Sequence, residues 1–302
     1  MNSPTSWNGQ SRGSALGTRI FVRLISLFGV VPAYVLLLFV SMFYALADKQ
    51  SALAIRALRS HLGLRTSLWH RFRHCLCFGT SMIDRYAFLT GKQSFFRFES
   101  QREDLIAAAA AKGSGAILLG AHAGNWEIAG NLLSERLGAD VYYLMMDAER
   151  PEMKDLFKKA LDGRRTKVIP VGEGGLDLVM AVRSALKGNG LVCMHGDRVA
   201  PGQKAQKHNF LGKDVWFPLG PFAVAAAIGA PVIPIMVTKT GLRKYIFKAY
   251  APILFDGNTA DNRDKYIFTA VERYVGILEQ AVKAKPYEWF NFYDFWAGIP
   301  GK

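Results

Sequence analysis

The sequence predicts an α/β fold, in which a mixed, mostly parallel sheet is flanked by helices and preceded by an apolar membrane helix. From residue 99 onward, short apolar runs alternate with helical stretches, as expected for strands joined by crossover helices. The run from Leu24 to Ala47 contains no charged residue. The chain has 302 residues, 50% of them hydrophobic, and a formal net charge of +14, which predicts one substantial core and an anionic partner or surface.

Composition divides the chain into four parts, namely a basic segment (1–23), the apolar helix (24–47), a basic amphipathic region (48–98) and the α/β domain (99–302). As one helix the apolar run would reach about 36 Å, enough to enter or cross a bilayer. It lacks a clear cleavage site, so we expect it to be retained. Pro32 near its middle predicts a kinked, re-entrant helix, and a single span is the alternative.

The region 48–98 mixes arginines with Leu, Phe, Trp and Tyr, which is typical of helices on an anionic membrane surface. An ordinary solvated basic face is the alternative. Basic residues flank the apolar run on both sides, which places both flanks in the cytoplasm. Nucleic acid is not expected as a partner because no recognisable binding module is present.

The α/β domain contains a regular series of candidate elements. The predicted strands are Gly115–Ala121, Val141–Met146, Lys167–Pro170, Leu191–His195, Val232–Thr238 and Tyr245–Ala249. The predicted helices are Arg102–Lys112, Ile128–Leu137, Met153–Leu161, Leu176–Leu186 and Phe222–Ala227. Helices on both faces of a mixed sheet follow from this order.

The cysteines indicate a reduced, cytosolic domain without a metal site. Cys75 and Cys77 are too close in sequence for an ordinary disulfide, and Cys193 stands alone. His70 and His74 lie four residues apart near that pair, but no second ligand pair with zinc-like spacing follows. We therefore predict no metal.

The motif GAHAGNWEIAG, residues 120–130, has the features of a catalytic loop. A buried strand ends there, His122 is displayed, and Asn125 is placed to cap the following helix. Glycines allow the bend that folds Glu127 back toward the imidazole. A neutral histidine oriented by a carboxylate can take a proton from an attacking hydroxyl or amine, so we predict His122 as the base and Glu127 as its partner.

A histidine followed after four residues by an acidic residue resembles the lysophospholipid acyltransferase superfamily, and HAGNWE is close to its bacterial lipid A late acyltransferases. The resemblance covers most of residues 20 to 300 and implies a glycerol-3-phosphate acyltransferase-like fold. It carries over Asp197 and Arg198 of HGDRV as substrate-binding residues. Arg198 could stabilise an oxyanion or bind an anionic headgroup, with Asp197 holding it in place, and a structural ion pair is the alternative.

The resemblance implies further binding residues. In residues 147–165 Arg150 or Arg164 would contact donor or acceptor phosphate, and Gly220 would let the backbone approach the thioester. Asn125 belongs to the same set. In PYEWFNFYDFW, residues 286–296, the basic residues of the lipid A enzymes are replaced by Tyr293, Asp294 and Phe295, which indicates an acceptor other than lipid A.

The predicted function is therefore O- or N-acyl transfer at the cytoplasmic side of a bacterial inner membrane. The donor would be acyl carrier protein, an acidic partner suited to a basic enzyme, or acyl-CoA, and the acceptor a membrane lipid or lipid-like molecule. No cofactor is implied, because the thioester supplies the activation. The alternatives are a basic protein that binds anionic lipid without catalysis, and an acyl-thioester hydrolase, against which the absence of a G-x-S-x-G motif argues.

Overall fold

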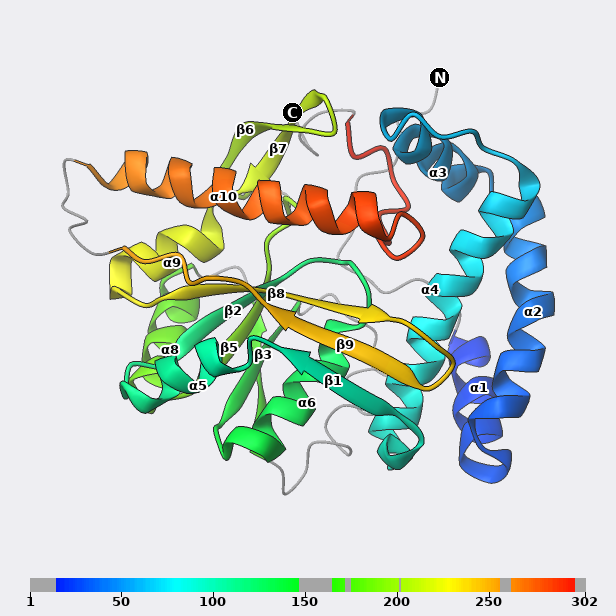
Figure 1. Cartoon of the computed structure of the whole chain (residues 1–302), viewed down its shortest axis with the longest axis horizontal. Helices are drawn as coiled ribbons and strands as arrows, with labels where there is room; N and C mark the ends of the chain where they lie inside the picture. Colours follow the sequence, from blue (N-terminus) through cyan, green and yellow to red (C-terminus); the bar gives the residue numbers. More distant parts are fainter. Residues whose placement is uncertain (1–14, 147–164, 172–174, 201, 256–261, 297–302) are drawn as a thin grey trace.

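The computed structural model describes residues 15–146, 165–171, 175–200, 202–255 and 262–296. An α/β part forms most of the molecule, and a group of N-terminal helices lies along one side of it (Figure 1). In the described residues the main sheet has seven strands in the order β1-β9-β8-β2-β5-β3-β4. The predicted α/β class with a mixed, mostly parallel sheet is confirmed.

Five neighbouring strands of the sheet, all predicted from the sequence, run parallel to one another. These are β2 (Ala116–Gly120), β5 (Leu191–His195), β3 (Val141–Met146), β4 (Thr166–Val171) and β8 (Val232–Lys239). Every residue of β2 is buried, because helices cover both faces of a parallel sheet. Their carboxyl ends share one edge, which is where ligands bind in such sheets.

The remaining strands complete one side of the sheet and add a hairpin. β9 (Lys244–Ala249) runs antiparallel to β8, and β1 (Arg97–Gln101) runs parallel to β9 at the edge. β6 (Ala205–Phe210) and β7 (Lys213–Pro218) pair with each other. β1, β6 and β7 were not predicted, because each mixes polar and apolar residues and lacks the continuous apolar run of the central strands.

The helices of the α/β part are α5 (Asp104–Ala111), α6 (Trp126–Leu137), α8 (Gly175–Lys187), α9 (Gly220–Ile228) and α10 (Arg263–Ala284). The first four agree with prediction, whereas α10 was not predicted. It buries an apolar stripe that runs from Ile267 to Val282. In Figure 1 this helix crosses the upper part of the molecule, below β6 and β7. The predicted helix Met153–Leu161 lies outside the described residues.

The N-terminal apolar run forms two helices. α1 (Ala15–Phe28) ends at Gly29, which has a φ of 83°, and α2 (Val30–Ala47) follows directly. The expected break at Pro32 is wrong, because this proline lies in the first turn of α2, where its missing N–H is not needed. By length and composition α2 is the one helix among the described residues that could cross a membrane, with a hydropathy of 2.2 and 28% of it buried.

Two further helices connect the apolar pair to the sheet. α3 (Lys49–His61) is followed by α4 (Leu68–Leu89), and a short 3₁₀ turn, η1 (Gln93–Phe95), leads into β1. α4 lies between α2 and the sheet (Figure 1). The expectation of membrane-surface helices throughout 48–98 needs correction here, because the residues from Ile83 to Leu89 are all buried.

Candidate active site

The site is built where two neighbouring parallel strands end. β2 and β5 pair in parallel with Gly120 opposite His195, so the residues just after each strand emerge side by side. His122 follows β2 and Asp197 follows β5. The sheet thus brings together two motifs that are far apart in the sequence.

His122 is held by Asp197 at two points. Its ring nitrogen Nδ1 lies 2.8 Å from Asp197 Oδ1, and its backbone N–H donates to Asp197 Oδ2 at 3.0 Å. The His122 side chain keeps 21% of its surface exposed, whereas that of Asp197 is fully buried. An ionised carboxylate can only accept, so Nδ1 carries the proton and Nε2 carries the lone pair.

Two residues near the C-terminus also bind this carboxylate. Trp289 Nε1 donates to Asp197 Oδ2 at 3.1 Å, and Asn291 Nδ2 donates to the same oxygen at 3.2 Å. Burial alone would raise the pKa of Asp197, but the charge and hydrogen bond of His122 and the charge of Arg198 hold it well below the usual range. Asp197 is therefore ionised across the physiological range.

Arg198 is held by the same C-terminal segment. Its Nε donates to Asn291 Oδ1 at 2.6 Å and its Nη2 to the Phe290 carbonyl at 2.8 Å. In the structure Asp197 thus holds His122, and Asn291 and Phe290 hold Arg198, which differs from the expected pairing of Asp197 with Arg198. Burial, and next the positive charge of Arg198, lower the pKa of His122, so its imidazole is neutral at pH 7 and suited to act as a base.

A second imidazole lies against the first. The rings of His122 and His195 have centroids 4.1 Å apart at an angle of 33°. Burial and the neighbouring His122 hold the pKa of His195 well below its ordinary value, so this ring is neutral as well. His195 was not predicted as a site residue, although its place at the end of a strand, as the first residue of HGDRV, was a usable signal.

The loop that carries His122 is clamped from both sides. Gly124 N–H donates to the Glu288 carbonyl at 2.7 Å, and Asn125 N–H donates to the Val237 carbonyl of β8 at 3.0 Å. Gly124 has a φ of +65°, and a Cβ there would lie 1.6 Å from the Val237 oxygen. The bend therefore requires glycine at this position.

The structure describes the side chain of Asn125, the next predicted residue of this loop, but not that of Glu127. Asn125 precedes the first residue of α6 as expected, but its side chain makes no capping bond and instead donates to the Ser81 carbonyl of α4 at 2.9 Å. Glu127 is the second residue of α6, and its side chain lies outside the described part of the structure. Its pairing with His122 stays a prediction.

The remaining predicted binding residues lie elsewhere. Arg150 and Arg164 fall outside the described residues. Gly220 opens α9 in an exposed position, with no atom within 4 Å of where a Cβ would lie, so packing does not demand a glycine there. Among the described residues no three His, Cys, Asp or Glu side chains gather in a metal-binding group.

The chain is similar in sequence to known acyltransferases. The sequence model of the family described as bacterial lipid A biosynthesis acyltransferase matches residues 78–297. The phosphatidylinositol mannoside acyltransferases of Mycobacterium tuberculosis strains H37Rv and CDC 1551 are each 26% identical over 196 residues, 64% of this chain. The matched region spans 58% of the length of these relatives. The crystal structure of the 1-acyl-sn-glycerophosphate (LPA) acyltransferase PlsC from Thermotoga maritima is 14% identical with a TM-score of 0.38, covering 86% of this chain and 97% of that one.

Proposed function

The chain belongs to the bacterial lipid A biosynthesis acyltransferase family, and on that basis we propose that it transfers a fatty acyl group from acyl carrier protein or coenzyme A to a hydroxyl or amine of a lipid-like acceptor. The contact between His122 Nδ1 and Asp197 Oδ1 carries the proposal. It orients a neutral imidazole at the carboxyl edge of the sheet, which is what deprotonation of an acceptor requires.

In the proposed reaction His122 Nε2 takes the proton of the acceptor hydroxyl or amine while its oxygen or nitrogen bonds to the thioester carbonyl carbon. The buried carboxylate of Asp197 stabilises the imidazolium that forms. The carbon–sulfur bond then breaks, and the proton passes from Nε2 to the departing thiolate. The acceptor is acylated, the carrier leaves as a thiol, and His122 returns to its neutral state.

Arg198 takes part through its fixed charge. Two of its nitrogens are bound to Asn291 and Phe290, so the guanidinium is held close to His122. A preorganised cation at this place favours the negative oxygen that develops on the thioester carbonyl. We assign Arg198 to the oxyanion, with Asp197 acting on His122.

The predicted role of Glu127 was to orient the His122 imidazole, and we now propose a different one, because Asp197 already binds the ring nitrogen Nδ1. Asp197 accepts from the His122 ring, so the two carboxylates divide the work in our proposal. Asp197 sets the tautomer of His122, and Glu127 acts on the acceptor side of the site. Separate substitutions of Asp197 and Glu127 can distinguish these roles.

The acceptor we propose is a lipid other than lipid A. The mycobacterial relatives are named for a phosphatidylinositol mannoside, which shows that matched sequences include enzymes named for other acceptors. Tyr293, Asp294 and Phe295 stand where basic residues are expected for lipid A, which supports the same conclusion.

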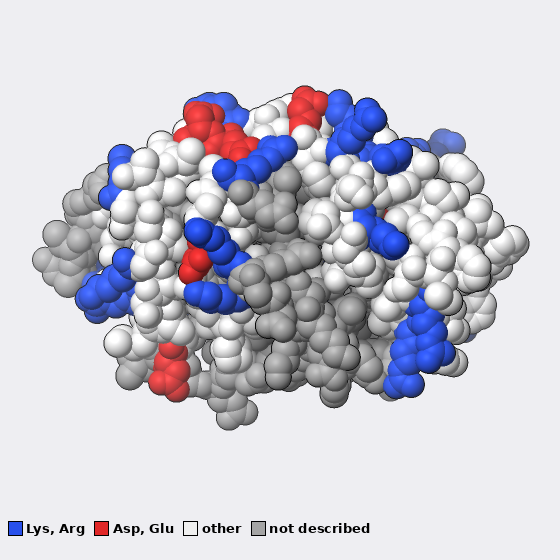
Figure 2. Space-filling view, turned by 90° about the horizontal axis from the view of Figure 1, so that it is seen from below, with Lys and Arg blue, Asp and Glu red and all other residues white. Residues whose placement is uncertain are grey.

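We propose that the enzyme binds the cytoplasmic surface of the inner membrane through α1 and α2. Large apolar side chains on both helices are exposed, among them Leu27, Phe28, Phe39, Phe43 and Leu46. A patch of this kind marks a membrane or protein contact. Figure 2 shows a broad uncharged area between separate Lys and Arg groups at the right-hand end, which carries α1 and α2 in Figure 1. Such an arrangement suits an interfacial helical hairpin on anionic lipid.

The test compares the lipids of cells that contain the wild-type chain, no chain, His122→Ala, Asp197→Asn and Glu127→Gln. Mass spectrometry should find a species, heavier by one acyl group, that requires His122 and falls about 10³-fold or more in Asp197→Asn, because the wrong tautomer is favoured. Its fragmentation would identify acceptor and chain length. Equal lipid profiles in all five strains, with each variant folded and on the membrane, would support lipid binding without catalysis.

A further inference from the structure

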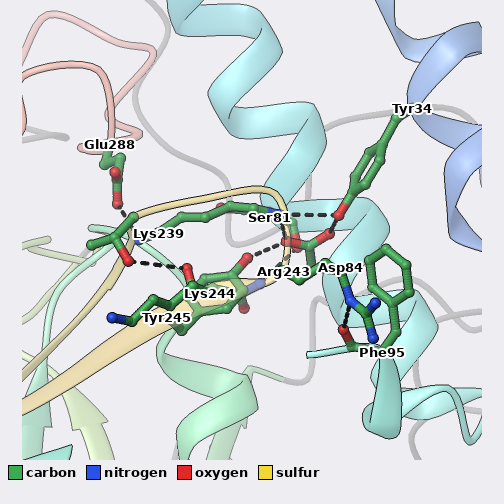
Figure 3. Close-up of polar contacts among 11 residues, drawn as sticks. Tyr34, Ser81, Asp84, Phe95, Lys239, Arg243, Lys244, Tyr245 and Glu288 are labelled. Atoms are coloured by element: carbon green, nitrogen blue, oxygen red, sulfur yellow. Dashed lines mark hydrogen bonds and ion pairs between the residues drawn. The ribbon is translucent and has the colours of Figure 1, made fainter. Parts of the chain in front are cut away.

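A buried polar network lies between α2, α4 and the end of β8. Asp84 of α4 is fully buried and accepts from Tyr34 of α2 at 2.5 Å. Tyr245 and Lys239 also donate to Asp84 (Figure 3). Lys239 Nζ donates to the Tyr34 hydroxyl at 3.0 Å as well. A buried carboxylate is stable only when such donors are in place, so the loss of one donor also weakens the contacts of the others with Asp84.

Lys239 connects this network to the supports of the catalytic loop. It is the last residue of β8, two positions after Val237, whose carbonyl accepts from Asn125 N–H. Its own backbone N–H donates to Glu288 Oε2 at 3.1 Å, and the Glu288 carbonyl accepts from Gly124 N–H. The two residues that bind the loop are therefore both connected to Lys239. Val237 lies two residues before it in β8, and Glu288 accepts a hydrogen bond from its backbone N–H.

The helix α4 provides a second connection. Ser81 lies three residues before Asp84, so the two residues face the same side of the helix. The Ser81 carbonyl accepts from the Asn125 side chain at 2.9 Å. One face of α4 thus holds both the catalytic loop, through Ser81, and the end of β8, through Asp84.

We propose that Tyr34, Asp84 and Lys239 form a positioning network that couples the seating of α2 to the placement of residues 122–125. The inference rests on the proposed function, in which the exposed face of α2 meets the membrane. Without lipid the apolar face of α2 is exposed to water, which favours a shift of the helix. Any such shift moves Tyr34 away from the buried carboxylate of Asp84. Asp84 and Lys239 then lose their arrangement, and the clamps on the loop loosen.

The test measures amide hydrogen exchange at Gly124 and Asn125 in the full chain bound to vesicles of phosphatidylethanolamine and phosphatidylglycerol. Tyr34→Phe removes one hydroxyl from the network. Tyr44→Phe is the matched control, because Tyr44 lies on the same helix with 43% of its surface exposed. Exchange at Leu118 in the buried strand β2 reports global opening in the same sample.

Tyr34→Phe should speed exchange at Gly124 and Asn125 about tenfold or more, the effect of losing a hydrogen bond to a charged group, with Leu118 unchanged. Tyr44→Phe should match the wild type. Consumption of acyl-carrier-protein thioester should show a lower kcat at constant KM in Tyr34→Phe, and Lys239→Arg should retain more activity than Lys239→Met.

If Tyr34→Phe accelerated exchange at Gly124 and Leu118 by the same factor, the proposal would be overturned, because a purely structural role would destabilise the whole core. Unchanged exchange at all three positions would overturn it as well. Should the chain consume no thioester at all, the proposed function fails, whereas the exchange measurement still decides whether α2 and the loop are coupled. Asp84→Asn provides a second variant that removes the charge and preserves the shape.

Discussion

Replacement of Gly124 by alanine tests whether the geometry of the His122 loop controls the reaction. Gly124 has a φ of +65°, and its amide donates to the Glu288 carbonyl. An added Cβ would lie 1.6 Å from the Val237 oxygen, whereas real Cβ contacts essentially never fall below 3.0 Å. Since that oxygen belongs to the backbone of a central strand, the loop must move by about 1.4 Å.

The expected cost has two parts. Alanine in the left-handed region costs about 1–2 kcal/mol. Displacement of the loop breaks the backbone hydrogen bonds of Gly124 and Asn125, at about 1 kcal/mol each. We therefore expect Gly124→Ala to lose about 3–4 kcal/mol of stability. A misplacement of about 1 Å at a catalytic group lowers the rate about 10²-fold, so activity should fall at least that far.

The matched control is Gly63→Ala. Gly63 has a φ of +68°, and nothing lies within 4 Å of its would-be Cβ, so this change carries the backbone strain without the clash. Thermal unfolding in detergent should show the larger loss for Gly124→Ala. Thioester consumption should be near wild type in Gly63→Ala. If both variants lose stability and activity equally, the contact between Gly124 and Val237 does not set the position of His122.

Three further outcomes follow from Arg198 in the site, from the buried His74 and from the exposed face of α2. Arg198→Gln should move the acid limb of the pH–activity profile to higher pH, because the Arg198 charge lowers the pKa of His122; an unmoved limb would contradict this. Burial lowers the pKa of His74 to about 4, so the unfolded chain binds the extra proton first and stability should fall by about 3 kcal/mol as pH drops from 6.5 to 4. His74→Gln should flatten that decline in chemical unfolding at several pH values. Phe39→Ser, at an α2 position that is 71% exposed, should weaken vesicle binding about tenfold in a flotation assay, while Phe268→Ser on α10 should leave it unchanged.

The central strands could be predicted because a strand that is buried on both faces is an almost continuous run of apolar residues. β2 and β5 are nearly continuous apolar runs, and both were found close to their observed bounds. α10 was missed, because its buried stripe is diluted by a charged outer face. β1 at the sheet edge alternates between exposed and half-buried residues, a weak signal over five positions.

Of the candidate site, His122 and its glycine-bearing loop could be predicted from local sequence, but the partner on its ring could not. Glu127 was close in the chain, whereas Asp197 comes close only because β2 and β5 are neighbours in the sheet. The order of parallel strands is set by the whole fold, so it cannot be predicted from the spacing of residues within one motif. Asn291, an amide within a run of aromatic residues, was the available hint of a buried polar contact.

The apolar N-terminal run shows a similar limit. Its charge-free length was evident, but the position of the break was decided by local backbone geometry. Gly29 adopts a positive φ between two helices, whereas Pro32 fits the first turn of α2 without disruption. Proline disrupts a helix interior and not its start, so position within the element matters more than residue type.

Because residues 288–291 hold Asp197 and His122 in place, the site can form only late in the synthesis of the chain. During synthesis α1 and α2 are made before the site, so in the proposed membrane arrangement they could bind the bilayer first. The site must wait, since Trp289 and Asn291 are translated long after His122. Under the proposed function, a ribosome-bound chain that stops short of these residues would have its membrane-binding helices but an incomplete site, and it would therefore be inactive.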